Sequence, residues 1–163
     1  MSKSEPPLIA FLAHSFAPDD KALVSIVSRL IKRTGMTVLT GERPEAKAVG
    51  QKVKERIDSA NLFIGLLTRR HKIRDGESWT TSPWVVEEKG YSIGQKPERP
   101  VILLIEDGIL VPSETGGLEG DLEFIPFRRY EFELAREQLR QVLASEIPRL
   151  RSVSHKKAQK AQK

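Results

Sequence analysis

Three polar segments of this sequence carry side chains that could bind a small ligand and act on it. His14-Ser15-Phe16 follows one apolar run, Thr68-Arg69-Arg70 follows another, and a later segment carries Trp84, Glu87 and Glu88. Arginine side chains bind phosphate groups through paired hydrogen bonds, and a few polar groups beside an aromatic ring and a carboxylate are typical of a ligand-binding cleft. The elements that hold these segments decide whether they meet.

The sequence lacks the common signatures of other enzyme classes. It has no glycine-rich dinucleotide or phosphate-binding loop and no serine-hydrolase or zinc-protease motif. It has no cysteine, which excludes a disulfide scaffold, a thiol nucleophile and a cysteine zinc site. Its three histidines, His14, His71 and His155, lack metal-ligand spacing, so we expect no metal site.

Strand and helix patterns alternate along the chain. Short apolar runs predict strands at residues 8–13, 37–40, 62–67, 101–105 and 124–127. Helical spacing of apolar residues predicts helices over about 18–34, 49–60, 83–94 and 131–150, with start chemistry at Pro18-Asp19-Asp20 and a stop at Gly35. The alternation favours an α/β fold: a flavodoxin-like, five-stranded parallel sheet with helices on both faces.

Such a sheet would bring the polar segments together at one edge. Ligands of open parallel sheets bind beyond the carboxyl ends of the strands, at the point where the strand order reverses. In the flavodoxin-like order this point lies between the first and third strands, which end at His14 and at Thr68. The loop from Gly41 to Lys47 flanks it, and the helix with Trp84 and Glu88 begins on the same side. We therefore expect one open cleft there.

The net charge of +5 arises in the last segment of the chain. Five basic residues and no acidic one follow from Arg151 onward, so residues 1–150 are balanced. We expect a disordered N-terminus at 1–7, one domain over 8–150, and a basic disordered tail or linker start at 151–163. A basic tail on a neutral domain gives weak support for nucleic-acid binding, and no apolar run suggests a membrane span or a signal peptide. We expect a cytoplasmic protein that binds neither nucleic acid nor membrane.

Three segments resemble the TIR (Toll/interleukin-1 receptor) domain family in its bacterial form. Ile9 to Ser15 resembles the first TIR signature, and Gly35 to Glu45 resembles the second, which is called the BB loop. Ser82 to Glu88 resembles the segment of NAD-cleaving members in which a tryptophan precedes the catalytic glutamate by four positions. The resemblance covers about residues 8 to 148.

The resemblance implies an NAD+ glycohydrolase that acts in signalling or antiviral defence. It would release nicotinamide and form ADP-ribose or a cyclised product, with NAD+ as substrate and with no cofactor. Glu88 would be the catalytic carboxylate, because breaking an N-glycosidic bond builds oxocarbenium character on the ribose. We expect Glu88 in the open cleft, where its replacement hardly changes stability, and Glu87 at the surface.

The resemblance also implies further site residues. The implied substrate-binding residues are His14, Ser15, Phe16, Arg43, Thr68, Arg69, Ser82 and Trp84. The implied self-association loop, through which other TIR domains would dock, is Gly41, Glu42, Arg43, Pro44 and Glu45.

Several alternatives remain open at this point. Trp84 could pack in the core instead of contacting a ligand, and His14 and Ser15 could simply cap a turn. The chain could be a non-catalytic TIR module that docks other TIR domains, which a Glu88 buried away from the cleft would favour. It could also resemble a nucleoside deoxyribosyltransferase, whose carboxylate likewise acts on a ribose.

Overall fold

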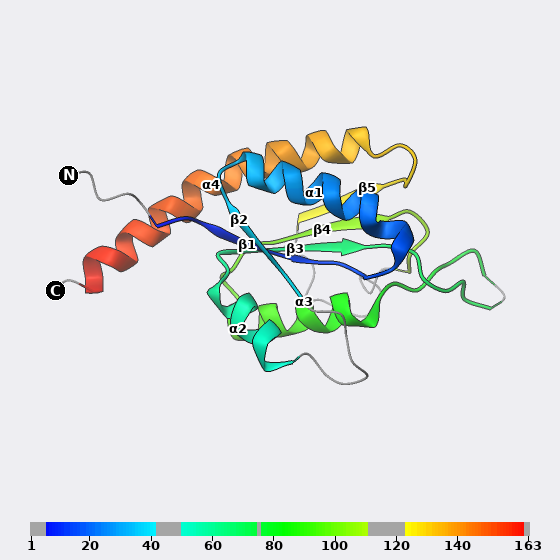
Figure 1. The fold of residues 1–163 in the computed structure, drawn as a ribbon, viewed down its shortest axis with the longest axis horizontal. Coiled ribbons are helices and arrows are strands. Elements are labelled where there is room, and N and C mark those ends of the chain that lie inside the picture. Colours follow the sequence, from blue (N-terminus) through cyan, green and yellow to red (C-terminus); the bar gives the residue numbers. More distant parts are fainter. Residues whose placement is uncertain (1–5, 42–49, 75, 111–122, 162–163) are drawn as a thin grey trace.

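The computed structural model describes residues 6–41, 50–74, 76–110 and 123–161. They form a five-stranded sheet between two layers of helices (Figure 1). The strands are β1 (Ile9–Ala13), β2 (Thr37–Thr40), β3 (Leu62–Leu67), β4 (Val101–Glu106) and β5 (Glu123–Phe127). The helices are the 3-10 helix η1 (Pro18–Asp20), α1 (Lys21–Arg33), α2 (Gln51–Ser59), α3 (Pro83–Gln95) and α4 (Glu133–Ala161).

The strand order is β2-β1-β3-β4-β5, and all pairings are parallel. This order confirms the predicted flavodoxin-like fold class. It reverses between β1 and β3, where Ala13 pairs with Gly65 near the carboxyl ends of both strands. The segments that follow β1 and β3 therefore start side by side, at the edge where open parallel sheets bind ligands.

Each face of the sheet has its own apolar core. On the face covered by α1 and α4, Val27 and Leu139 are fully buried against the strands. On the face covered by α2 and α3, the rings of Phe11 and Phe63 stack 5.8 Å apart, and Val85 of α3 is fully buried. The strands β1, β3 and β4 are apolar on both faces because helices cover both of their faces.

Helix α1 ends as predicted but begins differently. Gly35 has a φ of 85°, a left-handed conformation that glycine adopts without strain, and the helix stops just before it. Pro18 occupies the first turn of η1, as helix-start chemistry predicts. Asp20, however, makes no capping bond to either helix. Its side chain is fully buried and accepts hydrogen bonds from other parts of the chain.

Helix α4 is longer than the sequence indicated. The sequence predicts an end at Leu150 with a disordered tail beyond it, whereas α4 continues to Ala161 and extends past the sheet (Figure 1). The segment after Pro148 contains no glycine or further proline and is rich in lysine, alanine and glutamine, all good helix formers. Side chains 151–161 are exposed, apart from the half-buried Ser154. No helix in the described ranges is both long and apolar enough to cross a membrane.

Candidate functional site

Helix α3 places Glu88 on the side of the helix that faces the sheet. Ser82 precedes the helix in an extended conformation and Pro83 fills its first turn, where its missing N–H is not needed. The buried residues of α3 are Val85, Glu88, Lys89 and Ser92, one stripe at helical spacing. Glu87 is exposed, as expected. Glu88 is therefore a carboxylate on an otherwise core-facing stripe, only 6% exposed.

Glu88 reaches the carboxyl end of β2 through a contact with Gly41. A Cβ atom added to Gly41 would lie 2.5 Å from Oε1 of Glu88, closer than real Cβ contacts come. A larger residue at this position would have to displace the carboxylate, which is the far end of a flexible side chain. This contact joins the helix after β3 to the first residue after β2, so Glu88 lies at the carboxyl-end edge of the sheet, where open parallel sheets generally bind ligands.

The surroundings of Glu88 make its carboxyl group hard to ionise. Burial raises its pKa from 4.5 to about 7, and the negative charge of the neighbouring Glu87 adds to the effect. Within the described part of the chain, no hydrogen bond reaches its carboxylate. The expectation that Glu88 stands in an open cleft is wrong, because α3 turns this position toward the sheet. A buried acid that titrates near neutral pH is typical of functional sites.

Trp84 lies one helical turn before Glu88. Residues four positions apart share one helix face, so the indole and the carboxyl group are neighbours along α3. Trp84 is half-buried, and it belongs to neither apolar cluster of the described residues. Ser82 is buried at the start of the same helix, and its hydroxyl does not cap it.

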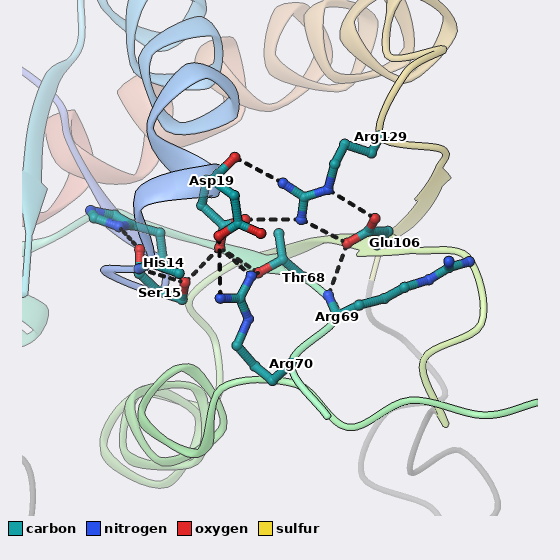
Figure 2. Close-up of polar contacts among 10 residues, drawn as sticks. His14, Ser15, Asp19, Thr68, Arg69, Arg70, Glu106 and Arg129 are labelled. Carbon is teal, nitrogen blue, oxygen red and sulfur yellow. Dashed lines mark hydrogen bonds and ion pairs between the residues drawn. The ribbon is translucent and has the colours of Figure 1, made fainter. Parts of the chain in front are cut away.

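Ser15 and Thr68, which follow β1 and β3, meet at a third residue. Both hydroxyls donate hydrogen bonds to Oδ2 of Asp20, at 2.5 and 2.6 Å (Figure 2). Arg70 Nη2 donates to the same oxygen at 2.9 Å. The structure thus brings Ser15 and Thr68 together, and a buried carboxylate already holds both hydroxyls. These hydrogen bonds hold the segments after β1 and β3 in place.

Arg129 connects this group to the ends of β4 and β5. Its Nη2 donates to Asp20 Oδ1 at 2.9 Å and to Glu106 Oε2 at 3.0 Å, and its Nε donates to Glu106 Oε1 at 3.1 Å (Figure 2). Glu106, the last residue of β4, also accepts a bond from the backbone N–H of Arg69 at 2.8 Å. Asp20, Arg70, Glu106 and Arg129 form what we call the charge network. It ties together the carboxyl ends of four strands.

Hydrogen bonds decide the charge states within the charge network. Burial acts to raise the pKa of Asp20, but bonds from Ser15, Thr68 and Arg129 and the charge of Arg70 outweigh it, and the pKa lies below 3.8. For Arg129, burial acts to lower the pKa, but its bonds to Glu106 and Asp20 outweigh it and raise the pKa. Both groups are therefore charged at neutral pH.

The remaining predicted residues lie around the charge network. The rings of His14 and Phe16 are 4.9 Å apart, and His14 Nδ1 lies 2.7 Å from the carbonyl oxygen of Ser15. The Arg69 side chain extends away from that of Arg70 (Figure 2): its Nε donates to the carbonyl of Asp107 at 2.5 Å, and its guanidinium lies 5.6 Å from the ring centre of Trp79. The predicted residues Glu42, Arg43, Pro44 and Glu45 lie outside the described residues.

Sequence reasoning missed Asp20, Glu106 and Arg129. Asp20 was assigned to a helix start because Pro-Asp-Asp is typical of one. Glu106 ends a strand and Arg129 follows another, and the rule that picked out Ser15 and Thr68, polar residues at strand ends, applies to both. The pairing of Arg129 with Asp20 spans 109 positions, and nothing local in the sequence indicates it.

Solved structures share the fold at low sequence identity. The CMP N-glycosidase BcmB of Clostridium botulinum superposes with a TM-score of 0.51 at 16% identity, over 80% of this chain and 97% of that one. The flavodiiron core of Flv1 from Synechocystis gives 0.56 at 14% identity, over 87% of this chain and 37% of that one. The TIR domains of the activated Roq1 resistosome give 0.46 at 14% identity, over 91% and 82%.

The two structures with TM-scores above 0.5 show a shared fold alone. No protein-family model and no curated protein sequence matches the chain. At such identities, folds of this type serve many unrelated functions.

Proposed function

We propose that this protein cleaves an N-glycosidic bond between a ribose and a base, with NAD+ as its substrate and Glu88 as its catalytic carboxylate. The observation that carries the proposal is the position of Glu88: a nearly buried acid against Gly41, at the ligand-binding edge, one turn after Trp84. The TIR resemblance of Ser82 to Glu88 supports the choice of NAD+. BcmB, which shares the fold, is by name a glycosidase of a nucleotide.

The reaction needs Glu88 in its ionised form. When the bond from ribose C1′ to the nicotinamide nitrogen breaks, the bonding electrons leave with nicotinamide, and positive charge develops on the ribose. An ionised Glu88 stabilises that charge or attacks C1′, and water then supplies the hydroxyl of ADP-ribose and releases a proton. A carboxyl group held in a dry site has a stronger electrostatic effect on this charge than one in water.

The other residues have supporting roles in the proposal. Trp84 forms a wall of the pocket, and Ser82, His14 and Phe16 contact the substrate. Ser15 and Thr68 act through Asp20 to hold the loops after β1 and β3 in place. Arg69, whose guanidinium bonds to the loop at Asp107, would need to turn to reach a phosphate.

Self-association belongs to the same proposal. Copies of this chain would dock through the loop of residues 41–45 and shift Gly41, the residue that lies against Glu88. Nicotinamide release per molecule would then rise with protein concentration. If it stays constant from dilute to concentrated protein, the assembly part of the proposal fails.

Two rival functions each have one observation in their favour. The burial of Glu88 favours a docking module without activity, as set out above. The fold shared with a CMP N-glycosidase favours a nucleotide other than NAD+. Incubating concentrated protein with NAD+ and, separately, with CMP distinguishes all three. Free nicotinamide supports the proposal, free cytosine alone moves the substrate to CMP, and neither product supports the docking module.

A further inference from the structure

A groove runs between α1 and α4, on the face of the sheet opposite α3 and Glu88. The two helices lie side by side there (Figure 1). The groove consists of two adjoining hollows of about 170 and 500 Å³ that share Leu30, Arg33 and Arg136. Ile26 and Arg29 complete the smaller hollow. The larger hollow is completed by Thr34, Glu133, Glu137 and Arg140.

The positive charge of the groove is concentrated in its smaller hollow. In the larger one, Arg140 binds Glu137 through two hydrogen bonds of 2.8 and 2.6 Å, and Arg136 lies 3.4 Å from Glu133. Arg29 and Arg33 form no ion pair with any described residue. The smaller hollow is therefore lined by three guanidinium groups and no carboxylate: Arg29 and Arg33, which have no ion-pair partner among the described residues, and Arg136, which also pairs with Glu133.

We propose that this groove is an anion-binding site that takes a diphosphate group, either free or carried by a nucleotide. Guanidinium groups bind phosphate oxygens in pairs, and two unpaired arginines beside a third that line one hollow can hold a group with several charged oxygens. The smaller hollow is below the size of an ordinary small-molecule pocket, about 300–1,000 Å³, and suits an anionic group alone. The larger hollow leaves room for the organic part of a nucleotide.

Helix stability alone does not account for the arginine pattern. Cations in the last turn of α1 stabilise its dipole, and Lys32 and Arg33 both do so. Arg29 lies a turn earlier, outside that region, and still lines the hollow with Arg33 and Arg136. Lys32, by contrast, lines neither hollow. The arginines of α1 are therefore placed along the groove, whereas the lysine is not.

Calorimetric titration of the full chain with inorganic pyrophosphate, and separately with ADP, tests the site. The double variant Arg29→Gln/Arg33→Gln should weaken pyrophosphate binding about tenfold or more, since each lost charged hydrogen bond weakens binding substantially. Lys32→Gln is the control for loss of charge on the same helix turn; it removes one positive charge, against two in the double variant, and should bind within about twofold of the wild type. Thermal unfolding confirms that each variant remains folded.

The outcomes separate this site from the proposed enzyme site. Pyrophosphate has no glycosidic bond, and Glu88→Gln should bind it like the wild type whether or not the protein cleaves NAD+. Binding of both probes through the arginines assigns the site to a nucleotide, and binding of pyrophosphate alone assigns it to the free anion. No saturable binding, or equal binding by the double variant and the wild type, overturns the proposal.

Discussion

The Cα of Gly41 lies so close to the carboxylate of Glu88 that a Cβ atom there would be 2.5 Å from Oε1. The residue after β2 and the inner face of α3 are thus in close contact at Glu88, the acid that we propose as catalytic. A methyl group at position 41 must displace the carboxylate, which is the far end of a flexible side chain.

Gly41→Ala should therefore reduce activity far more than stability. The small overpacking is relieved by movement of one side chain and should lower the free energy of unfolding by about 1 kcal/mol. A shift of about 1 Å in a catalytic group can reduce the rate about a hundredfold. Nicotinamide release and urea unfolding measure the two effects.

Gly90→Ala is the control for that change, because nothing lies within 4 Å of a Cβ at Gly90 on the same helix as Glu88. It should stabilise α3 by about 0.5–1 kcal/mol and leave activity unchanged. Equal activity in the Gly41→Ala and Gly90→Ala variants contradicts the importance of the Gly41–Glu88 contact.

Glu88 should make the protein less stable as the pH rises. Its pKa is about 7 in the folded protein and 4.5 in the reference state, so between these values the folded state binds more protons than the unfolded state. Below about pH 4.5, protonated Glu88 makes its full contribution to the free energy of unfolding. This contribution is lost as the pH rises through about 7, and the total loss is roughly 3 kcal/mol.

Glu88→Gln removes this titration. Urea unfolding from about pH 5 to about pH 8 should show the variant gaining stability relative to the wild type as the pH rises. A constant difference between the two proteins over this range means that Glu88 has an ordinary pKa. The same titration predicts that nicotinamide release by the wild type rises with pH through about 7, because the ionised form is needed.

The charge network should be essential for stability. Arg129→Met leaves the carboxylates of Asp20 and Glu106 buried without their shared cation, and removing one partner of a buried ion pair typically costs about 3–5 kcal/mol. Arg128→Met is the matched control, because Arg128 is 70% exposed and pairs with Asp107 at the surface, where such pairs contribute about 0–1 kcal/mol. If urea unfolding gives similar values for the two variants, the charge network does not hold the strand ends together.

Removing residues 152–163 should hardly change the melting temperature. The last turns of α4 pass beyond the sheet, and the described side chains from 152 onward are exposed or, at Ser154, half-buried. Burial contributes most of the stability of a helix in a protein, so turns that bury little contribute little. A fall of several degrees on truncation indicates that this part of α4 contacts the body of the protein.

The fold was predictable because its signals are local. Runs such as Leu62–Leu67 are apolar at every position, as strands covered on both faces must be, and their alternation with amphipathic helices fixes the class of fold. Glu88 and Asp20 show what local signals miss. Glu88 lies in the sequence Glu-Glu-Lys-Gly, which looks solvated, and only the packing of α3 buries it. Asp20 has the sequence context of a helix cap, and only the folded structure shows that it binds the distant Arg129.

The most direct test of the account is the release of nicotinamide from NAD+ by wild type, Glu88→Gln and Glu87→Gln at high protein concentration. Gln matches Glu in shape but lacks its charge, and loss of one preorganised charged group typically reduces the rate about a hundred- to a thousandfold. We predict that the wild type and Glu87→Gln release nicotinamide at similar rates and that Glu88→Gln, still folded, releases almost none. Equal release by all three proteins, or loss of activity in Glu87→Gln alone, contradicts the assignment of Glu88.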